Sequence, residues 1–368
     1  MKRTKSAALL ALGAFFILAV PPALACSSFL LERGDTLLVG HNLDEYMPVP
    51  GLIIVNPRGI AKHGLGGSMF NPLGRVKPRF VWVSKYGSLT YNPMGKEFPD
   101  GGINEAGLYV GEMSYYFTEW LKDKRLVRIY HNQWIQYLLD NFATVDQVLA
   151  DLSRVAPDGH NRWQFLVADA GGNAATITFF QGRAVVNTGD SLPVKALCNR
   201  RYAREMDTLR LYQGFGGRRQ VDFADTSDDR RFVRAAEMLR NQDRKLAAAD
   251  YAFAILRRLD WGNNRWSLVF DLKRRTVRFN TDRWRRVRAV DLAAFDLGPE
   301  APAMVLDINR QLEGDVAQRF TPFSDEIQKE YVAKMWDGID AGFLGNLMFK
   351  PLMKSRMVSA VRDFGPAR

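Results

Sequence analysis

The sequence predicts a single α+β domain in which antiparallel sheets are covered by pairs of helices. Strand-like and helix-like segments come in blocks, in the order strands, two helices, strands, two helices, strands and helices. Several strand-like segments are separated only by short turns, which favours hairpins and therefore antiparallel pairing. No Pro-, Gly- or Ser-rich linker divides the 368 residues, so we expect one domain over residues 26–368.

The composition excludes several classes of protein. Hydrophobic residues make up 47% and charged residues 25%, which rules out a disordered chain, a collagen-like chain and a polytopic membrane protein. The formal net charge is +11, but the basic residues are dispersed. The densest basic run, residues 283–288, alternates arginine with apolar residues as an exposed strand would, so no nucleic-acid partner is predicted.

Residues 1–25 have the pattern of a cleaved signal peptide. Lys2, Arg3 and Lys5 precede an uncharged stretch over 7–20, and Ala23-Leu24-Ala25 resembles a peptidase site. The apolar stretch is shorter than the roughly 20 residues that span a bilayer. We therefore expect export to the periplasm or the medium, cleavage after Ala25, and no stable membrane insertion afterwards.

The first half of the chain is expected to supply mostly strands. Residues 27–31 and 36–40 flank the turn Arg33-Gly34-Asp35 and predict a hairpin at the start of the domain. The spacing of apolar residues predicts a helix over 127–142, and Thr144 is a suitable N-cap for a second helix over 145–154. Further strands are predicted over 51–55, 80–84, 88–91 and 108–113.

In the second half, Gly171-Gly172-Asn173 predicts a hairpin turn between strands over 164–168 and 174–180. The strand pattern continues at 185–186 and 195–198. The remaining expected elements are amphipathic helices over 229–240 and 245–259, a meander over 266–272, 276–279 and 287–292, and helices over 326–336 and beyond Leu344. A helical C-terminal extension over residues 300–368, packed on the domain, is one interpretation of this region and stays open.

Cleavage after Ala25 would make Cys26 the first residue of the mature chain. Its thiol could then act as the nucleophile, and its α-amine, with a pKa of about 8, could act as the base. A lipid-anchored cysteine is the other interpretation, but the order Ala23-Leu24 is the reverse of the usual lipoprotein pattern. A Cys26–Cys198 disulfide would block the thiol and is not expected. The four histidines show no metal-binding spacing, so no metal or cofactor is predicted.

Short motifs that occur in the same order as in a known family strengthen this hypothesis. The sequence resembles the linear amide C–N hydrolases, which include choloylglycine hydrolases and penicillin V acylases and belong to the N-terminal-nucleophile hydrolases. The resemblance is carried by Cys26-Ser27-Ser28-Phe29-Leu30, Gly40-His41-Asn42-Leu43-Asp44, the segment 102–108, Leu197-Cys198-Asn199 and the segment 230–234.

The resemblance implies a four-layer αββα sandwich of two antiparallel sheets and hydrolysis of a linear amide. In that pattern Cys26 is the nucleophile and Asp44 holds its α-ammonium. Asn199 donates a hydrogen bond to the oxyanion, and Arg231 supports the charge network.

Two positions depart from the family pattern. Bile salt hydrolases have arginine at the position of His41, so we expect a charge beside the thiol that depends on pH. They also have a second oxyanion-site asparagine at the position of Ser114, whose hydroxyl reaches less far. Both departures leave specificity for bile salts open.

The sequence thus predicts an exported amidase that cleaves a small N-acyl substrate through a Cys26 thioester. An acyltransferase that uses an amine acceptor and a lipid-anchored binding protein without catalysis are the alternatives, and self-association stays open. Candidates for an apolar acyl pocket are Trp82, Tyr86, Tyr115, Tyr116 and Phe117. Because neighbouring residues of a strand face opposite sides, Cys198 is expected to point away from the site if Asn199 points into it.

Overall fold

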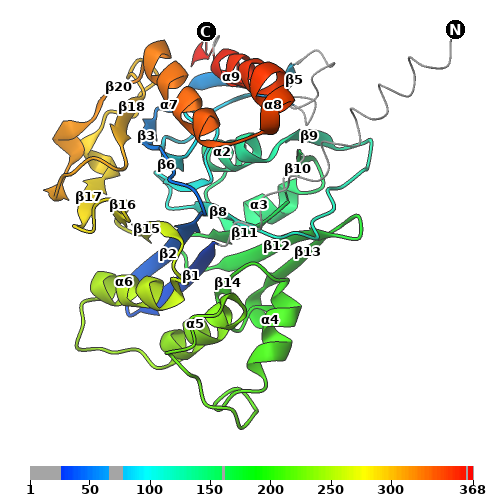
Figure 1. The fold of residues 1–368 in the computed structure, drawn as a ribbon, viewed down its shortest axis with the longest axis vertical. Coiled ribbons are helices and arrows are strands. Elements are labelled where there is room, and N and C mark those ends of the chain that lie inside the picture. Colours follow the sequence, from blue (N-terminus) through cyan, green and yellow to red (C-terminus); the bar gives the residue numbers. More distant parts are fainter. Residues whose placement is uncertain (1–25, 66–77, 160–161, 362–363, 368) are drawn as a thin grey trace, which may run out of the picture.

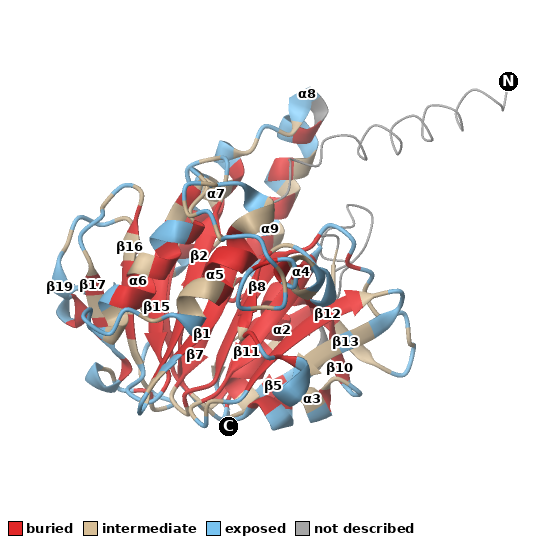
Figure 2. Ribbon diagram, turned by 90° about the horizontal axis from the view of Figure 1, so that it is seen from below, coloured by how far each residue is buried: buried red, intermediate tan, exposed pale blue. Residues whose placement is uncertain are grey.

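The computed structural model describes residues 26–65, 78–159, 162–361 and 364–367. The expected signal peptide, residues 1–25, lies outside the described residues. Two large, mostly antiparallel sheets pack face to face and helices cover their outer faces, which forms an αββα sandwich (Figure 1). Figure 2 shows that the buried residues follow the strands through the middle of the molecule.

The first sheet carries the N-terminal segment. Its strand order is β14-β1-β2-β15-β16-β17-β19. The expected hairpin is confirmed, because β1 and β2 pair antiparallel with Ser27 opposite Asn42, and Gly34 takes the left-handed conformation in the turn. The strands are β1 (Ser27–Arg33), β2 (Thr36–Asp44), β14 (Ala196–Leu197), β15 (Asn264–Asp271), β16 (Thr276–Thr281), β17 (Arg288–Asp291) and β19 (Gly314–Asp315).

The second sheet has nine strands in the order β13-β12-β11-β8-β7-β6-β3-β18-β20. The hairpin predicted around Gly172 is confirmed by the antiparallel pairing of β11 with β12. The strands are β3 (Leu52–Asn56), β6 (Ser88–Asn92), β7 (Gly101–Asn104), β8 (Tyr109–Ser114), β11 (Trp163–Ala168), β12 (Ala174–Phe180), β13 (Arg183–Thr188), β18 (Met304–Asp307) and β20 (Thr321–Pro322).

Smaller strands complete the described fold. Strand β9 (Val127–Tyr130) pairs parallel with β10 (Val155–Asp158). Strand β4 (Ile60–Leu65) pairs with β5 (Pro78–Val83) and with β21 (Gly365–Pro366).

Helices cover the two sheets on opposite sides. Helix α5 (Arg231–Arg240) and helix α6 (Ala248–Leu259) pack on the first sheet, and α2 (His131–Asn141) packs on the second. Helix α3 (Val145–Asp151) begins at Thr144, whose side chain accepts a hydrogen bond from the Gln147 N–H as an N-cap. The other helices are α4 (Tyr202–Leu209), α7 (Asp325–Gly338), α8 (Gly342–Leu344) and α9 (Lys350–Ser359).

The space between the sheets is filled by large apolar side chains. Tyr109 of the second sheet lies 5.0 Å, ring to ring, from Phe270 of the first, and Tyr91 lies 6.0 Å from the same ring. The two sheets therefore share one core, to which β1 contributes Phe29 and Leu31.

Two elements differ from expectation. Residues 127–130 form β9 rather than the first turn of a helix, because they pair with β10, and the helix begins only at His131. The region 300–322 is not part of a helical extension: β18 pairs with β3 and β20 with β18, so it completes the second sheet. Among the described residues, no helix is both long and apolar enough to cross a membrane.

Candidate functional site

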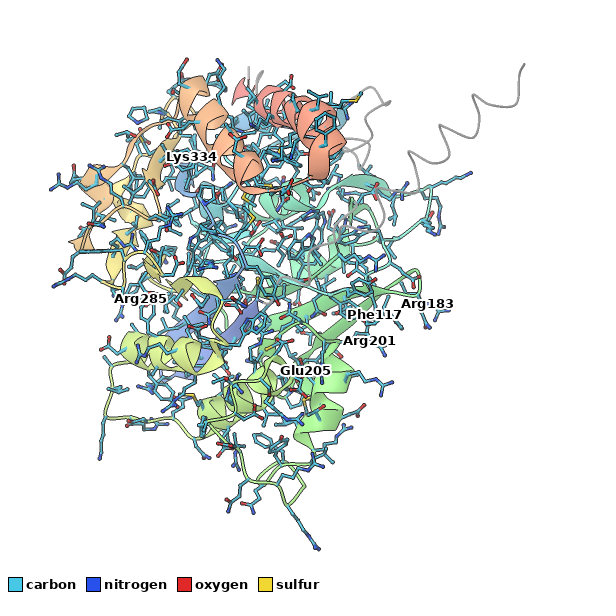
Figure 3. The ribbon with its side chains drawn as sticks, viewed as in Figure 1. Phe117, Arg183, Arg201, Glu205, Arg285 and Lys334 are labelled. Atoms are coloured by element: carbon cyan, nitrogen blue, oxygen red, sulfur yellow. The ribbon has the colours of Figure 1, made fainter. Side chains whose placement is uncertain are left out.

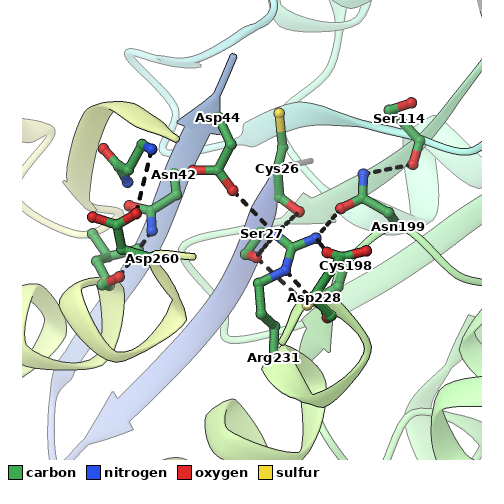
Figure 4. A network of polar contacts seen from close by, with 12 residues as sticks. Cys26, Ser27, Asn42, Asp44, Ser114, Cys198, Asn199, Asp228, Arg231 and Asp260 are labelled. Atoms are coloured by element: carbon green, nitrogen blue, oxygen red, sulfur yellow. Dashed lines mark hydrogen bonds and ion pairs between the residues drawn. The ribbon is translucent and has the colours of Figure 1, made fainter. Parts of the chain in front are cut away.

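The guanidinium of Arg231 holds together the residues that the sequence singled out. This side chain lies at the start of α5 and is fully buried. Its Nη1 donates to the Cys26 carbonyl at 3.1 Å and to Asp44 Oδ2 at 3.1 Å, and its Nη2 donates to Asn199 Oδ1. Cys26, Asp44, Asn199 and Arg231 thus form one connected network (Figure 4).

The register of three strands explains this convergence. Leu197 of β14 lies opposite Ser28 of β1, and continuing that register brings Asn199 beside Cys26. On the other side, β2 runs past the start of β1 and carries Asp44 to the same point. Neighbouring strands therefore bring together residues that are distant in sequence.

The Cys26 thiol is buried, and its surroundings disfavour the thiolate. Burial raises the pKa of the thiol well above its usual range, and the Asp44 carboxylate raises it further. The backbone N–H of Asp44 acts in the opposite direction by hydrogen bonding to the sulfur. A base close to the sulfur is therefore needed before Cys26 can attack a carbonyl.

Within the described part of the chain, only one of the two Asp44 carboxylate oxygens accepts a hydrogen bond. Its Oδ2 accepts from Arg231, whereas its buried Oδ1 has no hydrogen-bond partner among the described residues. Burial raises the pKa of Asp44 to about 8, and the neighbouring Arg231 counteracts part of this effect. A cation or a donor beside Oδ1 would keep the carboxylate ionised.

The side-chain amide of Asn199 has a fixed orientation. Arg231 carries only donors, so the amide must turn Oδ1 towards it and Nδ2 away from it. Nδ2 donates to the backbone carbonyl of Ser114 at 2.7 Å. Ser114 therefore contributes to the site through its main chain, and the structure records no contact of its hydroxyl with Cys26.

His41 lies away from the charge network. On β2 it faces the core between the sheets, where its Nδ1 lies 2.6 Å from Ser28 Oγ and 3.2 Å from the Tyr109 hydroxyl. Burial lowers the pKa of His41 to about 3. The expectation of a pH-dependent charge beside the thiol is therefore corrected, because a neutral imidazole supplies no charge near neutral pH.

Cys26 and Cys198 are both free thiols. Cys198 Sγ donates to Ser27 Oγ at 3.6 Å, so it lies against the residue after Cys26. Burial raises the pKa of Cys198 to about 12. A buried thiol that stays protonated acts as a packing residue and not as a second nucleophile.

Sequence reasoning missed two residues of the network. Ser27 Oγ accepts from Arg231 Nη1 at 2.7 Å, and the Asp228 carboxylate accepts from Arg231 Nη2. The i,i+3 spacing of Asp228 and Arg231 was a usable signal, because such pairs face each other at a helix start. Ser27 carried no comparable signal, since a serine in a strand has many roles.

The aromatic candidates separate into two groups. Tyr115, Tyr116 and Phe117 directly follow Ser114, the last residue of β8. Trp82 donates its indole N–H to Asp140 Oδ2 at 2.7 Å, and the backbone N–H of Tyr86 donates to the Asp140 carbonyl at 3.1 Å. Those two residues therefore pack near α2 instead. The described part of the chain holds no group of His, Cys, Asp and Glu side chains suited to a metal ion.

Part of the chain matches a known protein family. Residues 26–177 match the model of the linear amide C–N hydrolases, choloylglycine hydrolase family. A penicillin V acylase from Pectobacterium atrosepticum is 28% identical over 178 residues, which is 44% of this chain and 46% of that protein. The match thus spans about half of the curated relative.

Solved structures extend the likeness to most of the chain. The penicillin V acylase from Agrobacterium tumefaciens superposes with a TM-score of 0.70 at 21% identity, over 81% of this chain and 98% of that one. A variant of the conjugated bile acid hydrolase from Clostridium perfringens gives 0.63 at 16% identity, over 78% and 98%. At these identities the likeness establishes the fold, that of the N-terminal-nucleophile hydrolases. The pattern of the linear amide C–N hydrolases, choloylglycine hydrolase family, thus covers residues 26–177 and begins at Cys26.

Proposed function

We propose that the mature protein hydrolyses the amide bond of a small N-acyl substrate through an acyl-thioester on Cys26. The observation that carries this proposal is the Arg231 network. One buried guanidinium contacts the main chain of the nucleophile, a carboxylate and an oriented amide, which are three parts that thiol-based acyl transfer requires.

The reaction depends on removal of residues 1–25. With Cys26 at the N-terminus, its α-amine becomes a base next to the thiol, and the protonated amine favours the thiolate by its charge. The unpartnered Asp44 Oδ1 is a suitable acceptor for that ammonium group.

The residues then have separate tasks. The α-amine takes the thiol proton, and the sulfur attacks the carbonyl carbon of the amide. Asn199 Nδ2 donates to the oxyanion, while Arg231 and the Ser114 carbonyl keep the amide in place. The C–N bond breaks, and the leaving amine takes the proton from the α-ammonium. Water then attacks the thioester, releases the acid and restores the thiol.

An apolar acyl group would find aromatic side chains beside Ser114. The rings of Tyr116 and Phe117 lie 5.3 Å apart and are 54% and 61% exposed. The Arg162 guanidinium lies 4.6 Å from the Tyr116 ring and donates to the Tyr116 carbonyl at 2.6 Å, which steadies this segment. Figure 3 labels Phe117 and, next to it in that view, Arg201.

The test begins with mature protein whose N-terminus is confirmed as Cys26 by intact mass. It is offered penicillin V, conjugated bile salts, N-acyl amino acids and acyl-homoserine lactones, with Cys26→Ala as the matched control. We expect release of amine from at least one class and, after rapid acid quenching, an acyl mass increment on the Cys26 peptide. A mature protein that carries a diacylglyceryl group, or that hydrolyses no amide, contradicts the proposal.

A further inference from the structure

The loop between α6 and β15 places an indole beside the Asp44 carboxylate. Asn264 of β15 lies opposite Asp44 in the sheet, and the Glu45 N–H donates to the Asn263 carbonyl at 2.9 Å. The Trp261 ring packs edge-to-face on Tyr46 with 5.7 Å between the ring centres. The loop carrying Trp261 is therefore attached to the end of the strand that carries Asp44.

The loop is also internally fixed. Asp260 Oδ1 accepts from the backbone N–H of Gly262 at 2.8 Å and from that of Asn264 at 3.3 Å. Gly262 has φ +105°, a conformation that few other residues adopt. The position of Trp261 is thus determined by its backbone and not only by packing of its ring.

Two buried polar atoms at this contact have no other partner. Trp261 Nε1 and Asp44 Oδ1 are both shielded from solvent, and neither has a hydrogen-bond partner among the described residues. A buried donor and a buried acceptor that are left unpaired each destabilise the fold, so a bond between the two is favoured. The indole N–H lies close enough to the carboxylate to lower the pKa of Asp44, although burial dominates and raises it overall.

We propose that Trp261 is a positioning residue whose indole N–H pairs with Asp44 Oδ1 in the working site. Arg231 then holds one carboxylate oxygen and Trp261 the other, so the carboxylate has a single orientation. A carboxylate oxygen accepts more than one hydrogen bond, and Oδ1 can therefore receive the α-ammonium of Cys26 as well. The catalytic part of this inference rests on the proposed function, whereas the pairing itself does not.

The indole is chemically suited to this task. Its N–H donates only and does not titrate, so it stabilises the ionised carboxylate without adding charge. The charged or titratable groups that face Asp44 are Arg231, Asp228, Asp260 and the Cys26 thiol. Arg231 favours ionisation, and the two aspartates oppose it. Loss of the indole N–H should therefore raise the pKa of Asp44 and reduce its ionised fraction at a given pH.

The pairing can be tested without substrate. In protein labelled with ¹⁵N at the tryptophan indoles, the Trp261 resonance is identified by its loss in Trp261→Phe. We expect it to shift in one pH transition, and we expect that transition to be absent in Asp44→Asn. Trp336 of α7 is the control. Its indole N–H contacts Met357 Sδ at 3.0 Å, and its resonance should not respond to pH. A Trp261 resonance that is flat with pH in the parent protein overturns the inference, even if Asp44→Asn does not fold.

Kinetics test the catalytic part. Trp261→Phe should lower kcat about tenfold, leave KM nearly unchanged and move the acid limb of the pH profile to higher pH. Trp336→Phe should leave the profile unchanged. If Trp261→Phe has the parent profile, Trp261 is not a positioning residue. A protein that hydrolyses no amide but keeps the Asp44-dependent resonance shift refutes the proposed function and supports the pairing.

Discussion

Arg231 concentrates several tasks in one side chain, because its two terminal nitrogens reach the main chain of Cys26, Asp44 and Asn199. Lysine at this position would keep the charge but not the planar arrangement of donors. The geometry of the site therefore depends on a guanidinium and not only on a positive charge.

The two thiols should behave differently when replaced. Cys26→Ser should lose nearly all activity and keep the fold, since a hydroxyl is a much poorer nucleophile when only an amine serves as base. Cys198→Ala should keep most activity, because its sulfur contacts Ser27 rather than the reacting atoms. Amide hydrolysis and thermal unfolding of both variants check this. Comparable activity in Cys26→Ser and the parent would contradict the mechanism.

Asn199→Ala should lower kcat about a hundredfold or more, because it removes a positioned oxyanion donor. Asn199→Asp is the matched variant: it keeps the shape and the acceptor for Arg231 but replaces the donating nitrogen by oxygen. Both variants should be impaired alike in kcat. Normal kcat in Asn199→Asp would show that the amide N–H is not used.

At the scale of elements, the β1–β2 hairpin must pack closely against itself. A Cβ on Gly40 would lie 2.3 Å from the Phe29 ring, which is fully buried. Gly40→Ala should therefore destabilise the fold by about 1–3 kcal/mol through overpacking. Among the residues that the structure describes, none lies within 4 Å of such a Cβ on Gly365, so Gly365→Ala serves as the control. Urea unfolding of the two variants measures the difference, and equal midpoints would contradict the packing argument.

The elements also show how far the sequence was informative. The hairpins around Gly34 and Gly172 were predictable because a turn and its flanking strands are local. Strand β9 was mistaken for a helix, because the strand that it pairs with, β10, lies 28 residues further along the chain. Strand β18 was missed for the same reason: it is short, and its pairing with β3 is not local.

For the site as well, local motifs were predictable from the sequence and contacts between distant segments were not. Cys26, Asp44, Asn199 and Arg231 were identified through family motifs, but the motifs could not say that Arg231 contacts the other three residues. The environment of His41 was not predictable either, because its burial depends on Tyr109 from the other sheet. Trp261 had no motif, and its position follows from the pairing of β15 with β2.

At the scale of the whole molecule, the form of the N-terminus should control activity. A protein that retains one residue before Cys26 has an amide in place of the α-amine, which cannot accept the thiol proton. Such a protein should fold normally and show no amide hydrolysis, while the mature form is active. Intact mass and activity of the same preparation check this. Full activity of a verified uncleaved protein would exclude the amine as the base.

Two buried histidines should contribute less to stability in mild acid, because the fold holds them in the neutral form. Burial lowers the pKa of His41 and that of His131 to about 3, whereas the unfolded chain protonates them near pH 6.5. Their contribution is fully present above about pH 6.5 and is lost as the pH falls towards 3. Urea unfolding at several pH values gives the free energy of unfolding as a function of pH. This free energy should fall less steeply towards low pH in His41→Gln than in the parent, and identical pH dependence would contradict the assignment.

The pairing of β2 with β15 also bears on how the protein is made. Asn42 and its partner Ser267 are 225 residues apart, and Arg231 reaches Cys26 across 205 residues. A chain emerging from the ribosome therefore holds β2 with an open edge until most of the polypeptide has been synthesised. Until then Cys26 is an ordinary cysteine without Arg231 or Asn199 beside it. A nascent or truncated chain thus lacks the Arg231 network on which the proposed reaction depends, and that network forms only when the fold is complete.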